Sequence, residues 1–146
     1  MKNIYFFIPM LFALNGIPPA FGEIYWSKLD LMEKTLCKDL MKGESYHEVD
    51  ICIYRMLSDS TEKLEQRNKE TIKYLSKLKA FDDSEDAVKL FKKDQTAWKN
   101  YVVHRCAYKG HPYEKDSPMY FSNKSLCEAV ENYRRIESLE GELNIP

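Results

Sequence analysis

The sequence predicts an all-α fold, a small bundle of four helices (three to five) held together by two disulfides. The chain of 146 residues has only 5 Gly and 6 Pro, and residues 44–109 contain neither. All-β folds place such turn formers every few residues. Apolar side chains recur instead at steps of three and four, as on one face of a helix. All four Cys lie after an N-terminal segment that has the pattern of an export signal. The rest of the chain, residues 23–146, has the length of one domain.

Residues 1–22 have the pattern of a signal peptide. A single Lys precedes an apolar run over 4–14, and small residues, Ala20 and Gly22, stand at the spacing that a signal peptidase recognises. The alternative, a membrane anchor, needs about 20 apolar residues. We predict cleavage before Glu23, no membrane span after cleavage, and a periplasmic or secreted protein.

Two helices are expected in the first half of the mature chain. The first, over 23–41, has apolar side chains at steps of four, three, four and four and ends before a glycine. Ser45 and Glu48 have the spacing of a capping box for the second, whose apolar positions continue to residue 78. Because 58–70 is mostly polar, this helix is either long and partly solvated or locally broken.

Two more helices are expected in the second half. The polar cluster at 82–86 offers side-chain acceptors for a helix start. The third helix then ends near Gly110, and a loop of about a dozen residues follows. Ser122 is a plausible cap for the last helix, which runs to Leu139. The residues that share one face of the third helix are Val88, Phe91, Gln95, Trp98, Val102 and Cys106.

This map predicts how the cysteines pair. Cys37 and Cys52 flank the first loop, and Cys106 and Cys127 repeat that relation across the second. An exported chain meets an oxidising compartment, so the pairing 37–52 with 106–127 is expected. Closing loops of this size stabilises a small fold by about 3 kcal/mol each in chain-entropy estimates.

A zinc site is the competing interpretation of the second pair. Cys106 and Cys127 could bind zinc with His104 or His111, but the sequence has no CxxC, and structural zinc needs four ligands at recognisable spacing. We therefore expect neither a metal nor another cofactor. No nucleophile elbow, phosphate loop or dinucleotide fingerprint occurs, so an enzyme is not predicted. The net charge of −1 gives no case for nucleic acid.

A motif of the third and fourth helices resembles a known family. The run Gln95-x-x-Trp98-x-x-Tyr101 is followed by Cys106, a loop, Cys127 and then Arg135. This pattern is similar to that of the exported bacterial lysozyme inhibitor LprI-like family. Val102 and Val103 depart from it where the family usually has Arg-Asp.

Physically, the four family-motif residues, Gln95, Trp98, Tyr101 and Arg135, are expected to be scaffold. An aromatic stripe at helical spacing is usually core, with Trp98 as a large anchor whose indole N–H needs an acceptor. Arg135 is expected to find a carboxylate on its own helix, at Glu131.

The resemblance implies a protein partner, a lysozyme or another cell-wall hydrolase or toxin. The second loop is the candidate binding surface, because a disulfide would restrain its ends and Tyr offers contact area at little entropic cost. The alternative is a surface connector. An immunity protein against a secreted toxin and a structural envelope module are the other functions considered. The candidate partner-binding residues are Lys109, His111, Tyr113, Lys115 and Tyr120.

Overall fold

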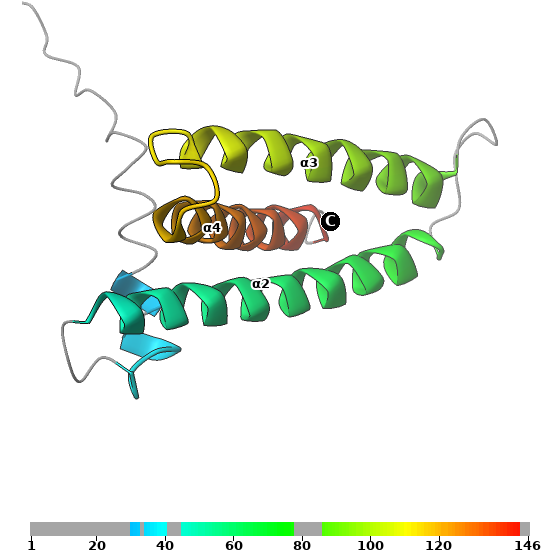
Figure 1. Cartoon of the computed structure of the whole chain (residues 1–146). Helices are drawn as coiled ribbons and strands as arrows, with labels where there is room; N and C mark the ends of the chain where they lie inside the picture. Colours follow the sequence, from blue (N-terminus) through cyan, green and yellow to red (C-terminus); the bar gives the residue numbers. More distant parts are fainter. Residues whose placement is uncertain (1–29, 33, 41–44, 78–85, 144–146) are drawn as a thin grey trace, which may run out of the picture.

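The computed structural model describes residues 30–32, 34–40, 45–77 and 86–143 (Figure 1). In these ranges the chain is helical and has no strand, which confirms the predicted all-α class. The predicted signal peptide, residues 1–22, lies outside the described residues.

The predicted first helix is shorter than expected in its described part. Residues 30–35 are helical except at the undescribed position 33, and 36–40 form turns. The amide of Cys37 donates to the carbonyl of Met32 at 3.1 Å, five residues back, so the α-helical ladder has ended. The turns bring Cys37 against the next helix, where its disulfide partner lies. The start of the predicted helix at residue 23 lies outside the described residues.

Helix α2 spans Tyr46–Leu75 without a break, which settles the open question about its polar middle. Ser45 is the N-cap, and its side chain accepts from the amide of His47 at 3.3 Å. The helix is therefore long and partly solvated, with Ser60 of the polar segment and Thr71 just after it in the interior. Their hydroxyls donate to backbone carbonyls one turn back, so burial leaves no hydroxyl proton unpaired.

Helix α3 spans Ala87–Gly110, as the polar cluster before it and the breakers after it predict. Asp86 is the N-cap, and its carboxylate accepts from the amide of Val88 at 2.9 Å. The expected face is observed: Phe91, Gln95, Val102 and Cys106 are buried.

Helix α4 spans Pro118–Leu143, so the predicted start at Ser122 and end at Leu139 are wrong. The connection between α3 and α4 is only 111–117, with Asp116 at a positive φ of 68°. Ser117 caps α4: its Oγ accepts from the amide of Tyr120 at 3.2 Å. Proline directly after a cap is favourable, because its missing N–H has no helical partner at that position.

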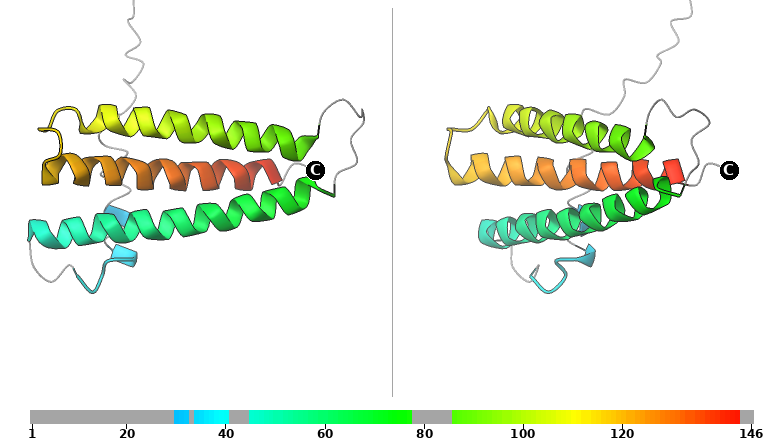
Figure 2. Two further views of the ribbon diagram at one scale, coloured as in Figure 1. Left: turned by 45° about the vertical axis from the view of Figure 1, so that its right-hand side comes forward. Right: turned by 90° about the vertical axis from the view of Figure 1, so that its right-hand side faces the viewer.

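Helix α4 is the central element of the bundle. It packs against α2 on one side and α3 on the other, whereas α2 and α3 touch each other little (Figures 1 and 2). The core has two parts, and Trp98 and Ile136 pack against both. The part near the disulfides is built from Cys37, Cys52, Ile53, Met56, Val102, Cys106, Leu126, Cys127, Ala129, Val130 and Tyr133. The part at the other end contains Leu64, Phe91 and Leu139.

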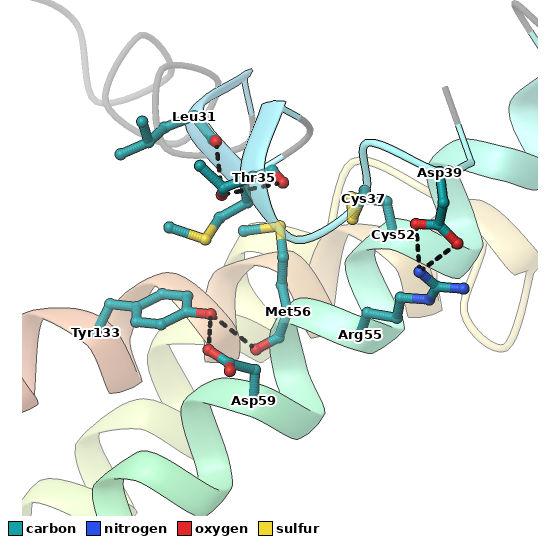
Figure 3. The surroundings of a disulfide bond; sticks show 10 residues. Leu31, Thr35, Cys37, Asp39, Cys52, Arg55, Met56, Asp59 and Tyr133 are labelled. Atoms are coloured by element: carbon teal, nitrogen blue, oxygen red, sulfur yellow. Dashed lines mark hydrogen bonds and ion pairs between the residues drawn. A yellow bond between two sulfur atoms is a disulfide. The ribbon is translucent and has the colours of Figure 1, made fainter. Parts of the chain in front are cut away.

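Both predicted disulfides are present, Cys37–Cys52 and Cys106–Cys127, and no cysteine is free. The first joins segment 34–40 to α2 (Figure 3). Beside it, Arg55 of α2 donates to both carboxylate oxygens of Asp39 at 2.8 and 3.0 Å. This ion pair is solvent-exposed, so the covalent bond is the stronger restraint.

A buried hydroxyl joins α4 to α2 next to this disulfide. Tyr133 donates to a carboxylate oxygen of Asp59 at 2.7 Å (Figure 3), and Lys63 pairs with the same carboxylate. Partial burial raises the pKa of Asp59, but the hydrogen bonds from Lys63 and Tyr133 outweigh it and leave that pKa below 3.8. Burial and the bond to Asp59 raise the pKa of Tyr133 well above its usual range.

Protonation of Asp59 is expected to weaken the fold in acid. A carboxyl whose pKa is lowered by folding contributes stability above its unfolded pKa of 3.8, and this stability is lost as the pH falls through the folded value. Urea unfolding at about pH 7 and about pH 3 measures the loss. Asp59→Asn should show a smaller drop than wild type. The exposed control Asp30→Asn should behave as wild type, and equal drops in all three proteins would contradict this role.

The close contact between α3 and α4 is predicted to require a glycine at position 110. A Cβ at this position would lie 2.8 Å from ring carbons Cδ2 and Cε2 of Tyr120, so the ring would have to move. Gly110→Ala should therefore lower the free energy of unfolding by about 1–3 kcal/mol. Urea denaturation checks this. The matched control is Gly141→Ala, because nothing lies within 4 Å of its Cβ, and it should raise stability by about 0.5 kcal/mol. Equal effects at both glycines would contradict the steric argument.

Candidate functional site

One end of the bundle carries both disulfides and is the candidate binding surface. We call it the disulfide end: the first turns of α2 and α4, the last turns of α3 and the connection 111–117 (Figure 1). The two covalent links fix α2 to segment 34–40 and α3 to α4 within a few turns of this surface. The surface is therefore held on restrained helices rather than on a long loop.

Large apolar side chains are exposed at the disulfide end. Tyr46 at the start of α2 is 87% exposed, and Tyr108 in the last turns of α3 is 69% exposed. Tyr113, Met119 and Phe121 are also exposed. Rigid aromatic side chains that stay in water are typical of surfaces that bind protein partners. Of these five residues, only Tyr113 is among those that the sequence predicts to bind a partner.

The five predicted binding residues all lie at this end, but in different settings. Lys109 is half-buried in the last turn of α3, whereas His111, Tyr113 and Lys115 are exposed. The ring of Tyr120 packs beside Gly110 and forms an edge-to-face pair with Phe121, with centroids 5.5 Å apart. Tyr120 thus packs beneath the surface on which His111, Tyr113 and Lys115 are exposed.

A small pocket opens at the same end, between the first turns of α2 and α4. Its volume is about 210 Å³. Tyr46 and Met119 of its lining are exposed, and Asp50 is the one charged residue among the described residues that line it. The hydroxyl of Ser122 donates to Asp50 at 2.5 Å, so the residue predicted to cap α4 instead joins α4 to α2. No sequence motif indicates this pair, because 72 residues separate its members.

Two of the family-motif residues meet in the interior. Arg135 of α4 pairs with Asp94 of α3, not with Glu131 of its own helix. With its amide oxygen turned toward Arg135, Gln95 accepts from Nε at 3.2 Å and from Nη2 at 2.5 Å, while its NH₂ donates to Asn68 of α2 at 3.2 Å. The four side chains join all three long helices at a point remote from the disulfides.

The other two motif residues lie in different environments. Trp98 is half-buried and packs against both parts of the core, whereas Tyr101 is 51% exposed. Trp98 also lines a hollow of about 320 Å³ between α2 and α3, with Leu64 and Val102 beside it. This hollow exists because α2 and α3 are both held by α4 and approach each other little.

The alternative zinc interpretation is wrong for its cysteines. Cys106 and Cys127 are bonded to each other and have no thiolate to offer a metal. Within the described ranges, no group of three or more His, Cys, Asp or Glu residues is placed to hold a metal ion. None of the helices in those ranges is long and apolar enough to cross a membrane.

Fold and site define the class: a small helical protein, cross-linked by two disulfides, with an exposed aromatic end. The family model described as "Lysozyme inhibitor LprI" matches residues 37–139, and the chain belongs to this family. The match runs from the first disulfide cysteine to the last turns of α4. The family's description is that of inhibitors rather than enzymes. Neither a curated protein nor a solved structure matches the chain.

Arg135 is predicted to be a main stabiliser of the end remote from the disulfides. Arg135→Met removes the partner of Gln95 and Asp94 and leaves the Gln95 carbonyl without its charged donor. Because the Arg135 side chain is only 12% exposed, we expect a loss of about 1.5–3 kcal/mol in the free energy of unfolding. Chemical denaturation measures it.

The control is Arg55→Met, which removes the exposed ion pair with Asp39. It should cost less than about 1 kcal/mol. If Arg135→Met costs no more than this control, the network does not hold the helices together.

Proposed function

We propose that the protein is an exported inhibitor that binds and blocks a lysozyme or another peptidoglycan hydrolase through its disulfide end. The observation that carries the proposal is the family match over residues 37–139. The match includes all four disulfide cysteines and the connection 111–117, which bears the exposed Tyr113. The two disulfides also suit a protein that works outside the cytoplasm.

The rigidity of the disulfide end supports a role in inhibition. Blocking an active site requires a surface that keeps its shape, because ordering a loop on binding costs affinity. Here the connection 111–117 is short, and the Cys106–Cys127 disulfide joins the helices on either side of it. Tyr113 in the connection and Tyr108 in the last turns of α3 offer exposed aromatic area with few torsions to fix.

The connection carries side chains of both charges: His111 and Lys115 are basic, and the exposed Glu114 and Asp116 are acidic. Glycoside hydrolases use a pair of carboxylates at the scissile bond, so their clefts are acidic at the centre. His111 and Lys115 are exposed beside Tyr113 and can face those carboxylates. Opposite charges at an interface speed association and select the partner. We infer that the connection enters the cleft and excludes the polysaccharide.

Inhibition of a c-type lysozyme by the purified mature protein, starting at Glu23, is the direct test. Hydrolysis of cell-wall substrate should fall as inhibitor is added in the micromolar range or below. The double variant Tyr113→Ala with Lys115→Ala should weaken inhibition at least about tenfold, as expected for central aromatic and charged contacts.

A matched control removes the same two residue types from the opposite end of α2. Tyr74→Ala with Lys77→Ala alters exposed side chains and should inhibit like wild type. Equal loss in both double variants would show that the disulfide end is not the binding surface. Absence of inhibition by wild type at micromolar concentration would exclude this lysozyme as the target.

A further inference from the structure

The hollow between α2 and α3 has the size and lining of a site for a small amphipathic ligand. Its volume is about 320 Å³, at the lower end of the roughly 300–1,000 Å³ typical of small-molecule sites. The buried side chains of Leu64 and Val102 are part of its apolar lining, and Trp98 is half-buried beside them. Its residues on α4, Glu128 and Asn132, lie in the middle of that helix, so the hollow is separate from the disulfide end.

Two carboxamides of the lining each have one half without a partner. Asn132 is only 8% exposed; its NH₂ donates to the hydroxyls of Ser60 at 3.2 Å and Thr61 at 3.3 Å, but its carbonyl oxygen accepts from none of the described residues. Asn68 shows the converse. Its carbonyl oxygen accepts from Gln95 at 3.2 Å, and its NH₂ has no acceptor within the described ranges. Because buried polar groups are normally paired, the hollow offers a ligand one acceptor and one donor.

The rim of the hollow adds charges of both signs. Lys99 and Glu65 are exposed there, and neither forms an ion pair with another residue that the structure describes. Opposite charges on one rim favour no ionic ligand, but they suit hydroxyl groups, which both donate and accept hydrogen bonds. A purely apolar ligand, such as an acyl chain, would cover the two carboxamides and leave them unpaired, which costs free energy.

We propose that the hollow binds an N-acetylated sugar unit of a β-linked glycan. A pyranose ring has an apolar face of C–H groups, which packs against the electron-rich face of an aromatic ring, and Trp98 would provide that ring. The acetamido group of the sugar carries one N–H and one C=O. These complement the free carbonyl of Asn132 and the free NH₂ of Asn68, and the sugar hydroxyls would reach the rim.

This inference goes beyond the proposed function, because it assigns the chain a ligand of its own. Only the choice of an N-acetylated sugar, the unit of cell-wall glycans, rests on that function. Since the hollow is separate from the disulfide end, a bound glycan would leave the inhibitor surface open. The protein would thus be retained on the substrate of the hydrolase that it blocks.

NMR titration of the full mature chain with N,N′-diacetylchitobiose tests the hollow. The indole signal of Trp98 and the methyl signals of Leu64 and Val102 should shift at millimolar sugar. Cellobiose is the matched probe, because it has the same linkage but hydroxyls in place of the acetamido groups, and it should bind at least about tenfold more weakly. Equal binding of both sugars, or no shift with either, would overturn the proposal. Shifts with octanoate alone would also overturn it and make the hollow an acyl-chain site.

Two variants change the lining without removing its apolar residues. Asn68→Asp keeps the acceptor for Gln95 but loses the free NH₂, so it should weaken binding of diacetylchitobiose at least about tenfold. Asn100→Asp, the same change at an exposed position of α3, should not. Val103→Arg places a long side chain at a rim position that is 56% exposed and should weaken binding too, whereas Leu90→Arg, outside the lining, should not. Normal sugar binding by Val103→Arg would refute the proposal even if Asn68→Asp fails to fold.

Retention on the cell wall is tested by sedimentation with purified peptidoglycan. Wild type and Leu90→Arg should sediment with it, and Val103→Arg should stay in solution. The two Arg variants have the same net charge, so a difference between them reports the hollow and not general attraction to an anionic polymer. Equal behaviour of the two would overturn the role of the hollow.

Lysozyme inhibition, measured separately, distinguishes failure of this inference from failure of the proposed function. Val103→Arg should inhibit like wild type, because the hollow is separate from the disulfide end. If wild type inhibits without binding diacetylchitobiose, the sugar site is wrong and the inhibitor function stands. If wild type binds the sugar but does not inhibit, the sugar site stands and this lysozyme is excluded as the target.

Discussion

Helix α4 is the element on which the structure depends, because α2 and α3 both pack against it and approach each other little. A helix with two buried sides needs apolar or satisfied polar groups on both. Ala129 and Val130 are fully buried, while Asn132 donates to Ser60 and Thr61 of α2. Arg135 reaches α3. The bundle is therefore two helix pairs that share one member, and each pair has its own polar contact.

The two ends of the bundle are held by different means. At one end covalent bonds link the helices, and the interior there includes the cysteine side chains themselves. At the other end the apolar cluster is small, and the network around Arg135 supplements it.

The proposed inhibitor surface and the small pocket between α2 and α4 follow from the same arrangement. The first turns of α2 and α4 and the last turns of α3 meet at one end of the bundle (Figures 1 and 2). The connection 111–117 projects from it, and the pocket lies beside that connection, between α2 and α4.

The sequence by itself determined the helical class, the disulfide pairing and the buried face of α3. Each depends on local spacing: steps of three and four for a helix face, and cysteines that flank a turn for a disulfide. Local spacing did not locate the start of α4, because Ser117 and Ser122 are both able to cap a helix. The proline after Ser117 decides the matter, as it suits the first position of α4.

Only the tertiary structure decided which distant polar groups meet. Arg135 has a carboxylate available on its own helix at Glu131, but it pairs with Asp94, 41 residues away, where Gln95 adds a second acceptor. Asp50 and Ser122 are likewise far apart in sequence. Such partners depend on how α4 is rotated between its two neighbours. That rotation is fixed by packing of the whole core, which no single helix pattern contains.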